Sequence, residues 1–162
     1  MHSFLAMIEP SRALQKPSVL CVARYVVKRL GGSVVQIKLH KLLYYCQAAS
    51  LVWHDKTLFD APIQAWANGP VVTEVWAANR YRGVVSLSDL ADDGTSLDKL
   101  DKNCVESIIK AYGDLSGYEL SAQTHNEKPW IDARKGLKSG EQGRNQIEPD
   151  AIRDYYRKVW TN

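Results

Sequence analysis

Ser121, Thr124 and His125 are the residues whose types and spacing come nearest to a reactive site. Ser121 and His125 are four residues apart, so on a helix their side chains share a face and could touch. Glu127 or Asp132 could orient the histidine, as the acid of a hydrolytic triad does. The sequence offers no nucleophile elbow and no evident oxyanion hole, and a histidine at a helix end more often bonds to terminal carbonyls. We therefore predict that the protein is not an enzyme.

Histidines and cysteines do not form a pattern typical of a metal site. His40 and His54 are fourteen residues apart in one predicted helix, which separates them by about 21 Å, too far to share an ion. Cys21, Cys46 and Cys104 are widely spaced, and no CxxC pair exists. We expect no metal and no cofactor, and we interpret the cysteines as small buried side chains in a reducing compartment.

Lys38 and Lys41 are the basic pair that could recognise a partner. They are three residues apart, so they share a helical face and could contact an acidic patch or a phosphate. The alternative is a solvated stripe on an otherwise buried helix. Other basic residues would track phosphates only if the fold gathered them. Acidic residues are almost as many and the net charge is only +3, so nucleic acid is the less favoured partner.

The aromatic residues offer a second way to bind a partner. Tyr44 and Tyr45 point about 100° apart on a helix, so we expect one in the core and the other, Tyr45, as the candidate for a partner surface. Trp66, Gly69 and Pro70 form a rigid corner, because glycine permits unusual backbone geometry and proline fixes the next helix entry. The corner either defines the fold or presents Trp66 as an interface anchor.

These residues must be positioned by helices, because apolar residues recur mostly at spacings of three and four. A helix apolar on most sides, from about Val35 to His54, is expected to be the hub. We predict a mainly α, single compact domain of about six or seven helices, with at most a short β-hairpin near Ile63–Val72. The other predicted helices span Val19–Leu30, Val71–Tyr81, Leu97–Tyr112, Ser116–His125, Pro129–Lys135 and a last segment from Pro149.

Length and composition fit this prediction. A chain of 162 residues suits one domain, and 45% apolar with 24% charged residues is ordinary for a soluble globular protein. No apolar run approaches the roughly 20 residues of a membrane span, and the first residues lack the features of a secretory signal. We predict an N-terminal arm at residues 1–16, one domain at 17–162, no membrane partner and a cytoplasmic location.

Three blocks of sequence in this order resemble the Panacea domain of the SocA-like antitoxin family, which has phage-associated members. The resemblance spans roughly Val19 to Trp160, and Asn68 stands where relatives often carry an aromatic residue. The blocks are Lys38-Leu39-x-Lys41-Leu42-Leu43-Tyr44-Tyr45-x-Gln47, Leu58-Phe59-Asp60-x-Pro62-Ile63-x-Ala65-Trp66-x-x-Gly69-Pro70-Val71-Val72 and Leu120-Ser121-x-x-Thr124-His125-x-x-x-Pro129-Trp130-x-x-Ala133-Arg134.

The resemblance implies a bacterial, mostly helical antitoxin that neutralises a toxin by direct protein contact. It also implies an alternative, in which the protein is an adaptor that delivers the toxin to an AAA+ protease. A nucleic-acid-binding regulator is the third interpretation. The candidate partner-binding residues that combine these patterns are Lys38, Lys41, Tyr45, Trp66, Gly69, Pro70, Thr124, His125, Trp130 and Arg134.

Overall fold

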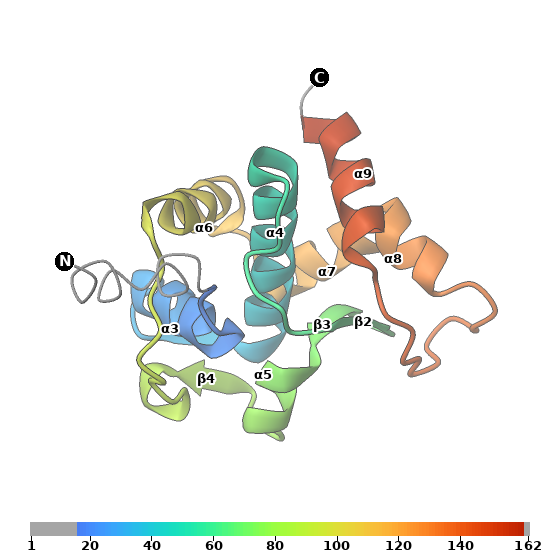
Figure 1. The fold of residues 1–162 in the computed structure, drawn as a ribbon. Helices are drawn as coiled ribbons and strands as arrows, with labels where there is room; N and C mark the ends of the chain where they lie inside the picture. The colour runs from blue at the N-terminus through green and yellow to red at the C-terminus, as the bar shows by residue number, and fades with distance from the viewer. Residues whose placement is uncertain (1–15, 161–162) are drawn as a thin grey trace, which may run out of the picture.

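The computed structural model describes residues 16–160, which form seven α-helices and two antiparallel two-stranded sheets (Figure 1). This confirms the mainly α fold. The helices are α3 (Val19–Arg29), α4 (Gln36–His54), α5 (Thr73–Ala78), α6 (Lys99–Tyr112), α7 (Gly117–His125), α8 (Lys128–Ala133) and α9 (Pro149–Trp160). The strands are β1 (Ser33–Val35), β2 (Ile63–Trp66), β3 (Gly69–Val72) and β4 (Val84–Ser86), and a 3-10 turn, η1 (Leu87–Asp89), follows β4.

The predicted N-terminal arm lies outside the described residues, apart from its last residue. Lys16 is described, and its ammonium forms an ion pair with Asp60 at 2.9 Å. From Val19 onward, one hydrophobic cluster joins every α-helix of the described range. No helix in residues 16–160 is both long enough and apolar enough to cross a membrane.

Helix α4 is the hub that the sequence predicted. Every residue from Leu39 to Leu51 is buried, and the helix contacts α3, α6, α7 and α9 as well as β3. Figure 1 shows α3 and α6 on one side of α4 and α7, α8 and α9 on the other. A helix that is apolar on most sides is stable only when neighbours cover it all round.

Tyr44 and Tyr45 are both fully buried, so the expectation that one of them is exposed is wrong. Helix α9 returns to cover this side of α4, and the Tyr156 hydroxyl contacts that of Tyr44 at 3.1 Å. The Glu127 carboxylate accepts hydrogen bonds from Tyr45 at 2.6 Å and from Tyr156 at 2.7 Å. Burial is therefore accompanied by hydrogen bonds to the hydroxyl groups, as buried polar groups require.

Local capping signals set where two helices begin. Ser116 and Glu119 have the sequence spacing of a capping box, and they form one at the beginning of α7. At α6, Thr95 and Asp98 have the sequence spacing of a capping box, but Asp98 caps the helix together with Asp101. The Thr95 hydroxyl instead accepts a hydrogen bond from the Ser18 backbone N–H at 3.1 Å. It thereby joins the start of α3 to the loop before α6.

The predicted hairpin is present, and its strands pair from Ile63↔Val72 to Trp66↔Gly69. Residues 145–147 pair with the free edge of β2, where the Ala65 N–H donates to the Asn145 carbonyl at 2.8 Å. Because Val71 and Val72 belong to this hairpin, helix α5 is shorter than the predicted Val71–Tyr81.

A second strand pair, β1 with β4, goes beyond the single hairpin that was expected. Val35 lies opposite Val84 and Ser33 opposite Ser86. Strands of three residues are too short for the alternating pattern that reveals a strand in a sequence. This small sheet places the beginning of α4 next to the segment after α5.

Candidate functional site

Most of the ten predicted partner-binding residues gather where the β2–β3 hairpin meets α4, α7 and α8. Lys38 and Tyr45 do not belong to this corner. The Lys38 ammonium donates to the Gly113 carbonyl at 2.6 Å, and Tyr45 lies in the buried tyrosine network beside α9. The residues at the corner are Lys41, Trp66, Gly69, Pro70, Thr124, His125, Trp130 and Arg134.

Gly69 allows the corner to form because its backbone has a φ of 118°, which other residues rarely adopt. A Cβ atom at this position would lie 2.6 Å from Lys41 Cε and 2.9 Å from Thr124 Oγ1. The aliphatic end of the Lys41 side chain therefore lies against Gly69, and its ammonium donates to the Pro70 carbonyl at 3.1 Å. Lys41 is only 1% exposed, so the alternative of a solvated lysine stripe is wrong for this residue.

Helix α8 holds the hairpin from the other side. Trp130 Nε1 donates to the Trp66 carbonyl at 2.8 Å, and Arg134 Nη1 donates to the Ala65 carbonyl at 3.1 Å. Arg134 also donates to the backbone carbonyls of Lys138, Glu141 and Gln142, which fixes the loop before residue 145. Trp130 and Arg134 thus hold strand β2 in position through hydrogen bonds to its backbone carbonyls.

Ser121 and His125 make separate contacts. The Ser121 hydroxyl donates to the Asn68 carbonyl, which fastens the hairpin turn to α7. The His125 ring stacks on Trp130 with centroids 4.1 Å apart. Burial, followed by the charges of Lys41 and Arg134, lowers the pKa of His125.

Beside the corner lies a hollow of about 450 Å³, bounded by the beginning of α4, the hairpin and the segment from α5 to β4. Its walls include Ile37, Trp66 and Trp76, and its polar rim includes Asn68 and Gln142. Lys41 also lines it, and its burial places it at the floor. A concave site that combines apolar side chains with convergent polar groups is the usual form of a binding site.

The polar neighbours of Lys41 in this hollow are already paired. Gln36 Nε2 donates to the carbonyls of Asn79 at 3.0 Å and Arg82 at 2.6 Å. His40 Nδ1 accepts from the Val72 N–H at 3.2 Å, and its Nε2 contacts Gln36 Oε1 at 3.2 Å. Burial lowers the pKa of His40 to about 3 and that of Lys41 to about 7. His40 is therefore neutral at pH 7, and Lys41 loses its proton more readily than an exposed lysine does.

The rim of the hollow exposes apolar side chains. The rings of Trp66 and Trp76 meet edge to face with centroids 5.4 Å apart, and both are half-buried. Val35 and Val84, opposite each other in the second sheet, are 50% and 51% exposed. We call Trp66, Trp76, Val35 and Val84, together with the hollow that the first three of them line, the tryptophan face.

Tyr81 adjoins the tryptophan face, being next in the chain to Arg82, which also lines the hollow. Its side chain is 93% exposed and its backbone has a φ of 66°. A bulky residue at positive φ is uncommon and is a feature that recurs at functional sites.

A shallower hollow of about 640 Å³ lies on the other side of the two tryptophans. Arg80 and Arg144 line it together with Glu74. Both arginines are exposed, and neither forms an ion pair with any residue between 16 and 160. The tryptophan pair is therefore flanked by two arginines and a single acidic residue, which leaves a net positive charge.

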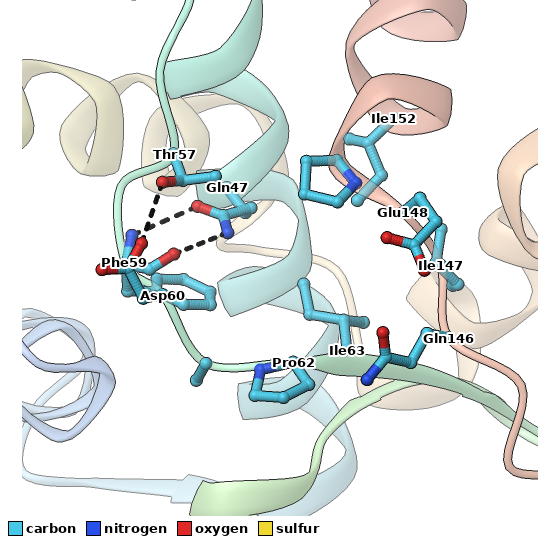
Figure 2. Close-up of a pocket in the computed structure, with 12 residues that line it drawn as sticks. Gln47, Thr57, Phe59, Asp60, Pro62, Ile63, Gln146, Ile147, Glu148 and Ile152 are labelled. Atoms are coloured by element: carbon cyan, nitrogen blue, oxygen red, sulfur yellow. Dashed lines mark hydrogen bonds between the residues drawn. The ribbon is translucent and has the colours of Figure 1, made fainter.

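Figure 2 shows a smaller pocket of about 240 Å³ between the segment after α4 and the start of α9. Gln47 uses both ends of its amide to hold this segment. Its Nε2 donates to the Phe59 carbonyl at 2.9 Å, and its Oε1 accepts from the Leu58 N–H at 2.7 Å. Because its best-placed buried polar side chain is committed to loop support, this pocket is the weaker candidate.

No group of three or more His, Cys, Asp or Glu side chains in the described part of the chain is arranged to hold a metal ion. Sequence reasoning included Trp66 among the candidates but left out Trp76, Tyr81, Arg80 and Arg144. Trp76 carries a signal that could have found it, since a second tryptophan follows Trp66 within the same motif-rich block. The arginines offer no comparable signal, because long-range folding alone brings Arg144 beside α5.

A family model described as antitoxin SocA-like, Panacea domain, matches residues 39–131. The matched range contains Lys41, the hairpin, both tryptophans of the face and Trp130, whereas Arg134 and the loop that it holds lie beyond it. No curated protein and no solved structure matches the chain.

Proposed function

Because the chain belongs to the SocA-like antitoxin family with a Panacea domain, we propose that it is the antitoxin of a toxin–antitoxin pair and neutralises its toxin by direct contact. The family supports the class of function. The direct contact with a toxin and a cytoplasmic site of action are parts of the proposal.

The tryptophan face carries the choice of binding surface. Trp66 and Trp76 are half-buried, and their rings pack edge to face with centroids 5.4 Å apart. Their rings are therefore held in place before any partner binds. Tryptophan is enriched among the few residues that supply most of the energy of a protein interface. A rigid anchor loses little conformational entropy on binding, which favours slow dissociation.

Inhibition then follows from occupancy. The antitoxin covers part of the toxin, blocks its active site or the approach of its substrate, and releases it when the antitoxin is degraded. No reacting group of the antitoxin takes part in this scheme, so Ser121 and His125 act only through the hairpin and Trp130 that they contact. Affinity is controlled mainly by the rate of dissociation.

A genetic selection tests the proposal. Random genomic fragments from the source organism are expressed in a host with and without this protein. We expect at least one open reading frame that is tolerated only when the protein is present. If the two hosts tolerate the same fragments, the proposal is wrong. A toxin that disappears from the cell when the protein is present, but is stable when an AAA+ protease is deleted, would instead indicate the adaptor function.

A further inference from the structure

We propose that the hollow of the tryptophan face is a carboxylate pocket, in which Lys41 receives an aspartate or glutamate side chain of the toxin. This inference rests on the proposed function, because it names the chemistry by which that function recognises its partner. It concerns a buried lysine whose hydrogen-bonding capacity the fold leaves largely unused.

Lys41 has one protein partner where it could have three. Its ammonium donates to the Pro70 carbonyl at 3.1 Å, and no carboxylate in residues 16–160 forms an ion pair with it. An ammonium group carries three N–H donors and no acceptor. Buried charges are normally paired, because burial without a partner is costly. An incoming carboxylate would supply the missing acceptors and the opposite charge.

The other polar groups of the floor cannot serve as alternative partners for Lys41. Both polar atoms of the Gln36 amide and both nitrogens of His40 are engaged with each other or with backbone groups. Gln36 has no titratable group, and His40 is neutral at pH 7 because burial lowers its pKa to about 3. Lys41 is therefore the group at the floor with donors still available.

The rim can complete a carboxylate site. Asn68 and Gln142 line the hollow, and neither of their side-chain amides makes a hydrogen bond within the described residues. Each amide supplies two further N–H donors. The hollow of about 450 Å³ has room for a short acidic side chain between the two tryptophans and the amides.

The charges around the pocket select an acidic protein surface. Arg80 and Arg144 stand exposed on the far side of the tryptophans, and Glu74 is the acidic residue that lines the same hollow. Arg82, at the edge of the pocket, is paired with Asp89 at 3.3 Å. Complementary charge raises association rates and disfavours wrong partners, so the toxin surface that docks here is expected to be acidic.

Small probes test the pocket without the toxin. The full-length protein is titrated with sodium acetate, with acetamide and with dimethyl phosphate, while tryptophan fluorescence and the ¹³Cε shift of Lys41 are recorded. We expect acetate to raise the pKa of Lys41 and to change the fluorescence, whereas acetamide, which has the same shape and no charge, does neither. Lys41→Met should abolish the acetate response. No response to acetate, or a stronger response to dimethyl phosphate that indicates a nucleic-acid backbone, would overturn the inference.

The toxin supplies the second arm. Lys41→Met should weaken toxin binding by roughly 30-fold or more, as expected when one partner of a buried charge pair is removed. Lys38→Met is the matched control, because Lys38 is on the same helix and donates to the Gly113 carbonyl away from the hollow. Asn68→Ala should weaken toxin binding less than Lys41→Met does. Because Asn68 is exposed, this variant is expected to fold, so it still tests the pocket if Lys41→Met misfolds.

The two proposals fail separately. Suppose that the wild-type protein neutralises a toxin, and that Lys41→Met and Asn68→Ala each bind this toxin as tightly as the wild-type protein does. The carboxylate pocket is then wrong, and the antitoxin function stands. If no toxin is found, the antitoxin function is wrong, and the acetate titration still decides whether the pocket binds carboxylates.

Discussion

Trp130 Nε1 donates a hydrogen bond of 2.8 Å to the backbone carbonyl of Trp66, which lies 64 residues earlier in the chain. This bond joins helix α8 to the end of strand β2, just where Trp66 emerges beside Trp76. Trp130 thus supports the strand, and Trp66 is the side chain that the strand presents. The candidate site depends on long-range contacts from the C-terminal third of the chain.

Replacing Trp130 with phenylalanine should remove this bond and keep an aromatic ring against His125. Loss of the hydrogen bond should lower the free energy of unfolding by about 1 kcal/mol, measured by urea denaturation. Trp76→Phe is the control, because it removes the same atoms from a residue whose indole N–H donates to no described residue. Equal losses in the two variants would show that the bond to Trp66 contributes nothing.

Truncating the half-buried anchor Trp76 should affect binding without unfolding the protein. Trp76→Ala is expected to weaken toxin binding by about 2 kcal/mol, the size typical of an interface hot spot, while the circular dichroism spectrum is unchanged. Trp66→Ala should act in the same direction. Tyr118→Ala is the control, since Tyr118 is 83% exposed on α7 and does not line the hollow. A Trp76→Ala variant that binds as tightly as Tyr118→Ala would place the interface elsewhere.

Gly69→Ala should be markedly destabilising, because an added methyl group meets Lys41 at 2.6 Å and Thr124 at 2.9 Å. Gly136 is a matched control, since it also has a positive φ but no atom within 4 Å of an added Cβ. Both variants therefore lose stability from backbone strain. Gly69→Ala should lower the free energy of unfolding by about 1–3 kcal/mol more than Gly136→Ala, because of overpacking. Thermal denaturation of both variants measures it, and similar midpoints would contradict the close packing at the corner.

Lys41 gives the stability of the protein a defined dependence on pH. Burial lowers its pKa in the folded state to about 7 from an ordinary value of 10.5. Between these two values the unfolded chain binds more protons than the folded protein, so stability rises with pH across this window. Below the window the folded state carries the full cost of the buried ammonium group. His40 and His125, the titratable side chains near it, have lowered pKa values and titrate below this range.

Lys41→Met should remove this contribution. We expect the variant to be more stable than the wild-type protein at about pH 6, with the difference shrinking as the pH approaches about 10. The buried tyrosines, whose pKa values are raised, are common to both proteins. Denaturant midpoints of the two proteins across this range provide the measurement. A stability difference that is independent of pH would show that Lys41 does not titrate within the window.

Periodicity predicted the parts of the fold that depend on local sequence. The hub helix, the stripe of α3 and the capping box of α7 all follow from residues within a few turns of one another. Tyr45 could not be placed in this way, because its burial depends on α9, which pairs Tyr156 with Glu127. Dependence on long-range contacts also explains why the β1–β4 pair was not predicted. Its two three-residue strands are far apart in the sequence and meet only in the folded domain.

The candidate site shows a similar division. The motif around Trp66, Gly69 and Pro70 predicted a rigid corner, and the structure has one. Nothing in the sequence indicates that Lys41 is buried, because a lysine one turn from solvent-facing residues normally extends its ammonium group into water. Its burial results from the close approach of Gly69, which only the folded hairpin provides.

The most direct test of the account is a titration of the purified toxin's activity with the purified antitoxin. We predict that activity falls in proportion to added antitoxin and ends at a fixed stoichiometric ratio, with no protease, nucleotide or cofactor present. Trp76→Ala should require a clear excess to reach the same inhibition. Inactivation of many toxin molecules by one molecule of this protein, or no inhibition until an AAA+ protease is supplied, would contradict neutralisation by occupancy.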